Sequence, residues 1–236
     1  DAVRHAVDYV GADADDILGV GVTVPGILDD EKQILISAPP LKAKNYDFTR
    51  LISAIDYPVV VMNDARAEAY ADHWFNGKPE DEKIYIMLGE GVGGAYINAS
   101  AIRNGVHNRG GEFGHMVIHP GGKQCLCGKK GCFEAYVSEK VLSSELDMTL
   151  DNFFELAAQG NKNNSNVLDE YMDNLALGIN NIYTMMDCDI VLGGTVAPYL
   201  KQYDNSIKER LVNDYSFDTD ADYLRISDGG GRKSGL

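Results

Sequence analysis

The sequence lacks long apolar runs and an excess of basic residues. No stretch approaches the roughly 18 consecutive apolar residues that a membrane-spanning helix needs, so we expect no membrane partner. The first segment, DAVRHAVDYVGADADD, reads as a helix end and a polar turn, not as a signal peptide.

The chain is strongly acidic. It has 21 Lys and Arg against 36 Asp and Glu, which gives a formal net charge of −15 that repels phosphate backbones. We therefore expect a soluble, cytoplasmic protein that does not bind DNA through this chain. A plainer interpretation of the acidity is that it only maintains solubility.

What is present is the composition of a globular α/β protein. Hydrophobic residues make up 44% and charged residues 24% of the sequence, and strand-like segments alternate with helical ones. A length of 236 residues suits one large or two modest domains. The polar segment Asn76–Glu82 resembles a connection between lobes. We therefore expect residues 1–76 to form part of a small α/β lobe and residues 77–236 to form a large one.

Local patterns predict the main elements. Ala65–Phe75 is helical by propensity, and the continuous apolar run of Tyr57–Asp64 predicts a buried strand. An apolar face stepping by three and four residues between Leu168 and Met186 predicts one long buried helix. Further strands are expected at Ile17–Gly26, Gln33–Pro40, Lys83–Gly89, Ala95–Ser100 and Cys188–Gly194, of which Lys83–Gly89 and Ala95–Ser100 form a hairpin.

Three of the four cysteines lie close together, at Cys125, Cys127 and Cys132. Three clustered cysteines leave one unpaired, which disfavours a disulfide scaffold, and the spacing is CxC and not the CxxC of redox pairs. Thiolates and imidazole are preferred zinc donors, and four of them close a structural site. The spacing therefore predicts zinc, with His115 or His119 as the fourth ligand.

Polar residues near this cluster and after one strand are candidates for substrate contacts. Glu112 and Glu134 lie on either side of the cluster, and two carboxylates with an imidazole between them can clamp the hydroxyls of a polyol. Solvated surface glutamates are the alternative. Asn63 and Asp64 lie where a strand ends and a helix begins, so Asp64 either takes a proton from a hydroxyl nucleophile or caps the helix.

Two glycine turns follow strands. GEGVGG (Gly89–Gly94) and LGGTV (Leu192–Val196) could cradle phosphate through backbone amides. An ordinary hairpin turn has the same composition, so both interpretations stay open.

Together these motifs resemble the ROK family of sugar kinases, open reading frames and repressors. The resemblance lies in IMLGEGVGGAYINASAIRNGVHNRGGEFGHM followed by CLCGKKGCFEAY, and in VTVPGILD, APPL, VVVMNDARAEAYAD and DIVLGG in family order. It implies a two-lobed actin-like (ribonuclease H-like) ATPase fold with sugar in the cleft.

The resemblance also implies a role for each matching residue. His115, Cys125, Cys127 and Cys132 would bind structural zinc. The contacts to sugar hydroxyls would come from Asn63, Asp64, Glu112, His115 and Glu134, with Asp64 as the base of a kinase. The turns containing Gly89 and Gly91, and Gly193 and Gly194, would face nucleotide.

Three departures separate the chain from the family's kinases. It has no D-x-G-G-T strand, so we expect the N-terminal strands of the fold to be missing from this sequence. Kinases usually have Thr where this chain has Glu90, and a carboxylate repels phosphate. The sequence stops at GGGRKSGL, about where a final helix would begin, which indicates part of a longer protein.

The sequence therefore predicts the sugar-sensing domain of a ROK transcriptional regulator. The ligand would be a hexose or N-acetylhexosamine, and DNA would be bound only by a domain outside this chain. The alternative is an ATP-dependent sugar kinase of the glucokinase or fructokinase type, with ATP and Mg²⁺. The family suggests a homodimer or homotetramer.

Overall fold

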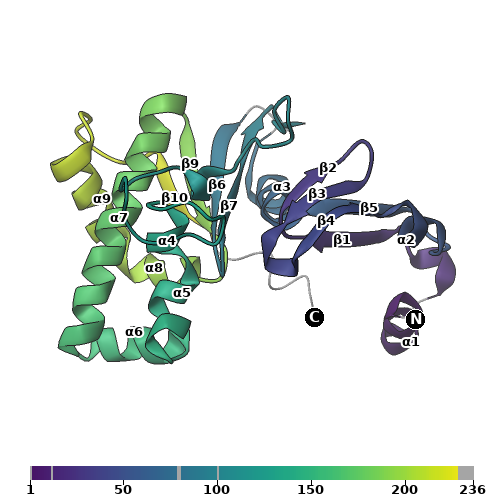
Figure 1. Ribbon diagram of the computed structural model, residues 1–236, viewed down its shortest axis with the longest axis horizontal. Coiled ribbons are helices and arrows are strands. Elements are labelled where there is room, and N and C mark those ends of the chain that lie inside the picture. The colour runs from purple at the N-terminus through teal and green to yellow at the C-terminus, as the bar shows by residue number, and fades with distance from the viewer. Residues whose placement is uncertain (1, 12, 79–80, 100, 228–236) are drawn as a thin grey trace. The chain divides into compact units, whose positions relative to one another are not determined.

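The chain divides into two compact units, residues 1–67 and 68–236. The computed structural model describes residues 2–11, 13–78, 81–99 and 101–227 (Figure 1). The units divide within helix α3 (Asp64–Asn76) and not after residue 76, where the sequence suggested a boundary. The reason is that the second half of α3 packs on the sheet of the second unit, where Ala69 is fully buried beside Tyr85.

The first unit contains two small sheets. Its elements are α1 (Ala2–Val10), η1 (Ala14–Asp16), β1 (Val20–Val24), β2 (Ile27–Asp29), β3 (Ile34–Ala38), η2 (Pro39–Leu41), β4 (Ala43–Asp47), α2 (Thr49–Ser53) and β5 (Val59–Asn63). Strands β1 and β5 pair in parallel, and β2, β3 and β4 form an antiparallel sheet. The strands expected at 17–26, 33–40 and 57–64 are thus confirmed.

The expectation that β5 is wholly buried is wrong. Val61 is 1% exposed and faces a core that includes Leu28 and Leu35, whereas Val60 is 57% exposed. Successive residues of a strand point to opposite faces, so an apolar run does not by itself show that both faces are covered.

The second unit contains a five-stranded mixed sheet. Its further elements are β6 (Glu82–Leu88), β7 (Val92–Asn98), β8 (Ala101–Ile102), η3 (Phe113–His115), α4 (Glu134–Val137), α5 (Glu139–Leu142), η4 (Ser144–Leu146), α6 (Leu150–Ala158), α7 (Lys162–Met186), β9 (Asp189–Gly193), α8 (Ala197–Leu200), η5 (Lys201–Tyr203), α9 (Asp204–Arg210), the π-helix η6 (Leu211–Tyr215) and β10 (Leu224–Ile226). The strand order is β10-β9-β6-β7-β8. Strands β10, β9 and β6 run parallel, and β6, β7 and β8 are antiparallel, which confirms the expected hairpin.

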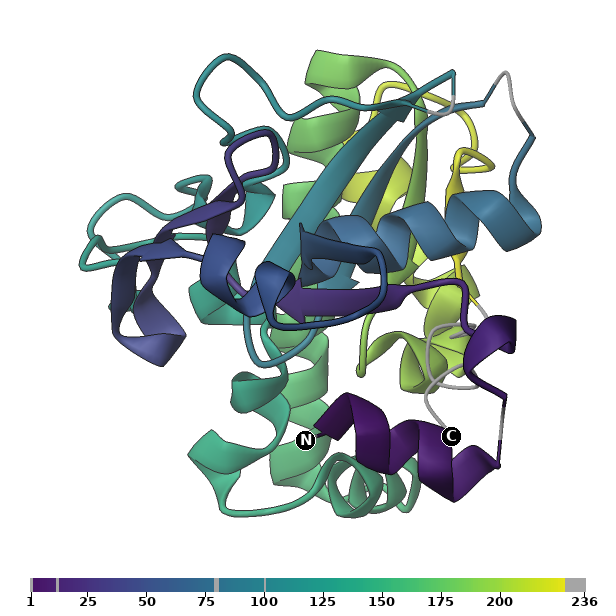
Figure 2. The same ribbon diagram turned by 90° about the vertical axis from the view of Figure 1, so that its right-hand side faces the viewer.

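Alternate residues of β6 serve two different cores. Ile84, Ile86 and Leu88 are fully buried in the main core, which α7 covers, and Tyr85 faces α3. Figure 2 shows α3 in front of this sheet and α7 behind it. The sheet therefore has a helix on each face.

Helix α7 confirms the expected long buried helix. Its apolar stripe is buried from Leu168 to Ile182, and Met186 packs half-buried against the same core. The side chain of Asn161 caps its first turn by accepting hydrogen bonds from the amides of Asn163 and Asn164. Among the described helices, none is both long and apolar enough to cross a membrane.

A buried ion pair fixes α3 to the sheet. The Asp72 carboxylate lies 2.6 Å from Nη2 of Arg225 and 3.6 Å from Nζ of Lys83, and it accepts a hydrogen bond from the Ser227 hydroxyl at 3.0 Å. Burial alone would raise the pKa of Asp72, but the hydrogen bond and charge of Arg225 outweigh it and lower the pKa.

We expect Asp72→Asn to lower the free energy of unfolding by about 3 kcal/mol, because it leaves the 4%-exposed Lys83 without its nearest charge partner. Urea denaturation measures the loss. Since the pKa of Asp72 is lowered in the folded protein, its contribution to stability is present at neutral pH and is lost as the pH falls through that pKa.

Asp173→Asn is the matched control. It removes an ion pair of 2.7 Å with Arg210, and the Asp173 side chain is 57% exposed. Its cost should stay below about 1 kcal/mol, and equal losses would contradict the prediction.

Candidate functional site

Four potential metal ligands meet between η3 and α4. They are His115, Cys125, Cys127 and Cys132, and their ligand atoms all lie within 4.8 Å of one another. The Sγ atoms of Cys127 and Cys132 are 3.7 Å apart, and Nδ1 of His115 is 3.8 Å from Sγ of Cys125. All four cysteines of the chain are free thiols.

The loop backbone is shaped to bring these side chains together. Short β-bridges join Val117 to Cys132 and Gln124 to Lys130, so the segment folds back on itself. Gly131 has a φ of +82°, and a Cβ at this position would lie 1.8 Å from the carbonyl oxygen of His119. A side chain therefore cannot replace this glycine without opening the loop.

The donor set fits a tetrahedral zinc ion. With Zn–S bonds of about 2.3 Å, the corners of a tetrahedron lie about 3.8 Å apart, which matches the two contacts above. Desolvation opposes ionisation of Cys127, yet a hydrogen bond from the Lys129 amide and those of two neighbouring thiols lower its pKa. Burial raises the pKa of Cys125 and Cys132, so a cation would be needed to hold all three sulfurs as thiolates.

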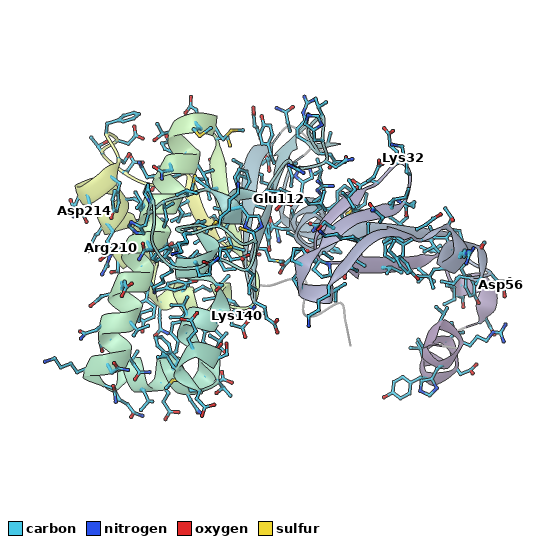
Figure 3. The ribbon with its side chains drawn as sticks, in the orientation of Figure 1. Lys32, Asp56, Glu112, Lys140, Arg210 and Asp214 are labelled. Carbon is cyan, nitrogen blue, oxygen red and sulfur yellow. The ribbon has the colours of Figure 1, made fainter. Side chains whose placement is uncertain are left out.

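The imidazole of His115 joins the cluster to a carboxylate. Its Nδ1 faces Cys125, and its Nε2 lies 3.7 Å from Oε2 of Glu112. Figure 3 marks Glu112, which immediately precedes η3. A metal on Nδ1 would leave Nε2 as the nitrogen that meets a ligand beside Glu112.

Glu134, the first residue of α4, links the cluster to the glycine hairpin. Its Oε1 is 3.4 Å from Sγ of Cys125, and its Oε2 accepts a hydrogen bond from the Val92 amide at 3.0 Å. The second unit thus brings Glu112, His115 and Glu134 to one cluster, as the polyol-clamp hypothesis requires.

His119 is held away from the cluster by a different partner. Its Nε2 lies 2.6 Å from Oδ1 of Asn174, whose amide nitrogen donates to the carbonyl of Glu170 at 2.7 Å. Because Oδ1 can only accept, Nε2 of His119 carries the proton. The structure therefore places His115, and not His119, beside the thiols. The sequence held no signal for this anchor on α7.

Asn63 and Asp64 lie in the first unit, at the start of α3. Asn63 caps the helix, since its Oδ1 accepts from the Arg66 amide at 3.0 Å. Oδ1 of Asp64 accepts from the Ala65 amide at 2.9 Å, yet burial outweighs these hydrogen bonds and raises the pKa of Asp64. Asn63 is therefore the residue that caps α3. Asp64 is a carboxylate whose pKa is raised by burial.

The two glycine turns carry carboxylate partners that the sequence analysis did not identify. The Gly194 amide donates to Oε1 of Glu68 at 3.3 Å, and the Thr195 hydroxyl donates to the Glu139 carboxylate. One available signal was Glu68 itself, a single acid in the alanine-rich stretch ARAEAYA one turn after Asp64.

Comparisons with known proteins agree with the motifs. The model of the ROK family matches residues 1–227. A putative xylose repressor of Caldicellulosiruptor sp. (strain Rt8B.4) is 27% identical over 231 residues, covering 89% of this chain and 58% of the repressor. A glucokinase of Streptomyces coelicolor is 34% identical over 144 residues, covering 60% of this chain and 45% of the glucokinase. The chain thus spans about half the length of these relatives.

A solved structure agrees with the expected fold. The ROK glucokinase of Streptomyces griseus, in complex with glucose and AMPPNP, superposes with a TM-score of 0.80 at 25% identity and covers 97% of this chain and 82% of that one. The prediction of the actin-like α/β fold is confirmed.

We expect the purified protein to contain one zinc ion per chain and Cys132→Ser to lose most of it, because Cys132 supplies a buried thiolate of the donor set. Mass spectrometry of the metal content under reducing conditions measures this. Cys188→Ser is the matched control, since Cys188 lies outside the cluster and should leave the zinc content unchanged. A wild-type protein without zinc, or equal loss in both variants, would contradict the assignment.

A second prediction concerns the basicity of Asp64. The pKa of Asp64 is higher in the folded protein than in the unfolded chain, so the ionised carboxylate destabilises the fold. The free energy of unfolding therefore falls as the pH rises from the pKa of the unfolded chain to the pKa of the folded protein. Asp64→Asn should therefore be at least as stable as the wild type at pH 7, with a gain that disappears toward pH 3. Thermal unfolding at both pH values measures it. A variant clearly less stable at pH 7 would refute this.

Proposed function

Because the chain belongs to the ROK family, we propose that it is the sugar-sensing region of a ROK transcriptional regulator. The observation that carries the proposal is the position of His115 between the metal-ligand cluster and Glu112, with Glu134 against the same cluster. Carboxylates accept hydrogen bonds from vicinal hydroxyls, and an imidazole that binds a metal through Nδ1 carries its proton on Nε2 and can donate a third.

A zinc ion would act as a brace in this proposal. His115, Cys125, Cys127 and Cys132 would hold it, and it would supply structural rigidity without taking part in any reaction. The loop it closes presents His115 and, through the contact with Cys125, Glu134. Asn63 and Asp64 remain predicted sugar contacts.

Similarity to the putative xylose repressor, which extends over 89% of the chain, supports a regulator for the whole protein. Kinase relatives cover comparable shares, 82% for an N-acetylmannosamine kinase and 97% for the Streptomyces griseus glucokinase structure, so coverage alone does not separate the two candidates. Glu90 in the β6–β7 turn also disfavours a phosphate at that turn. DNA binding through a separate domain, a homodimer or homotetramer, and a cytoplasmic location remain predictions.

The second candidate is an ATP-dependent sugar kinase, which the raised pKa of Asp64 favours. A carboxylate made more basic by burial suits a general base that takes the proton of a sugar hydroxyl. A coupled assay with ATP, Mg²⁺ and each sugar decides between the two. Sugar-dependent turnover that Asp64→Asn abolishes would establish the kinase.

We expect the zinc-loaded protein to bind one or more sugars from a panel of hexoses, N-acetylhexosamines and D-xylose. Calorimetry should give a dissociation constant that rises about tenfold in Glu112→Gln, because a neutral amide accepts hydrogen bonds from hydroxyls more weakly than a carboxylate. Glu145→Gln, an exposed carboxylate outside the cluster, is the matched control. Absence of binding by every sugar, with zinc in place, would refute the sensor.

A further inference from the structure

The two glycine turns of the second unit form one continuous surface. The Leu88 carbonyl, at the end of β6, accepts a hydrogen bond from the Val196 amide at 3.1 Å. A Cβ on Gly194 would lie 2.4 Å from that carbonyl, and a Cβ on Gly89 would lie 3.8 Å from Oγ1 of Thr195. A side chain at Gly194 would therefore clash with the end of β6, whereas the distance at Gly89 is an ordinary contact.

Carboxylates of the chain itself already occupy hydrogen-bond donors of this surface. The Gly194 amide donates to Glu68 at 3.3 Å, and the Val92 amide donates to Glu134 at 3.0 Å. The Thr195 hydroxyl donates to Glu139, whose own backbone amide donates to the Gly89 carbonyl at 2.7 Å. Backbone amides and hydroxyls in glycine turns are the groups that hold phosphate oxygens in other proteins.

Glu68 is anchored in this position by its helix. It lies on the part of α3 that packs against the sheet, next to the fully buried Ala69. Burial and then the charge of Glu68 raise the pKa of the Tyr85 hydroxyl. The Tyr85 ring in turn supports the β9 turn, since its oxygen is 1.7 Å from where a Cβ of Gly193 would lie.

We propose that Glu68 is a built-in anion that takes the place of a phosphoryl oxygen at the Gly194 amide and, together with Glu90, makes the two glycine turns reject nucleotides. A nucleotide would have to displace Glu68 from Gly194 and approach the charge of Glu90. An uncharged sugar at Glu112 and His115 meets no such repulsion. The inference extends the proposed sensor function, because it explains how a site that keeps its sugar contacts would avoid phosphoryl transfer.

Titration of Mg·ATP at constant ionic strength tests the proposal. Glu68→Gln keeps the size of the side chain but removes its charge, and Glu90→Thr replaces the second carboxylate by a hydroxyl. We expect the double variant to bind Mg·ATP about a hundredfold more tightly than the wild type, with about tenfold from each position after screening. Glu145→Gln changes the net charge equally at an exposed site and should stay within about twofold of the wild type.

A direct measurement of the Gly194 amide completes the test. Its ¹H–¹⁵N resonance should follow the titration of the Glu68 carboxylate in the wild type and lose that dependence in Glu68→Gln. This comparison needs only the wild type and Glu68→Gln, so it can be made even if the double variant does not fold. A wild type that binds Mg·ATP as tightly as the double variant, or a Gly194 resonance that ignores Glu68, would overturn the inference. Sugar binding by the same wild-type sample is scored separately, so loss of the sensor function and loss of this inference are distinguishable.

Discussion

The Glu134 carboxylate connects the metal-ligand loop to the β6–β7 hairpin, and the geometry of the candidate site depends on this contact. One oxygen lies 3.4 Å from the Cys125 sulfur, and the other holds the Val92 amide at 3.0 Å. This side chain therefore links the metal loop to the β6–β7 hairpin, in addition to the close packing of Gly114 on the Val92 carbonyl. Three thiols, which lose their protons when they bind a metal, and the carboxylates of Glu134 and Glu112 lie close together. A divalent cation would neutralise much of their negative charge. The proposed metal thus affects the hairpin and the clamp as well as its own loop.

Helix α3 shows how environment gives opposite properties to two carboxylates of one helix. Asp72 is buried with Arg225 and Lys83 beside it, and its pKa is lowered. Asp64 is half-buried, its hydrogen bonds do not outweigh the desolvation, and its pKa is raised. The first contributes stability at neutral pH and the second reduces it. A destabilising carboxylate retained at a helix start is what a functional role for Asp64 would require.

Local features were predictable from the sequence, and contacts between distant segments were not. The stripe of α7, the β6–β7 hairpin and the His115–Cys132 spacing each follow from residues near one another in the chain. Glu68 and Gly194 are 126 positions apart, and their contact exists only because α3 packs on the sheet that contains β9. The exposure of Val60 was missed for a related reason, because strand burial depends on which partners cover each face. Spacing alone left His119 open, the family resemblance favoured His115, and the contact of His119 with Asn174 on α7 accounts for its exclusion.

The same carboxylates have opposite effects on sugars and on phosphates. A sugar hydroxyl carries a proton that it can donate to Glu112, so a carboxylate is a good partner for it. A phosphoryl group carries only acceptor oxygens and negative charge at neutral pH, so every carboxylate near it is unfavourable unless a cation lies between them. Glu68 and Glu139 accept hydrogen bonds from the Gly194 amide and the Thr195 hydroxyl, so two donors that could offset this repulsion are already used. Sugar recognition and nucleotide rejection can therefore arise from one choice of residue type, provided that the carboxylates are held by the fold, as Glu68 is by α3 and Glu134 is by the hairpin.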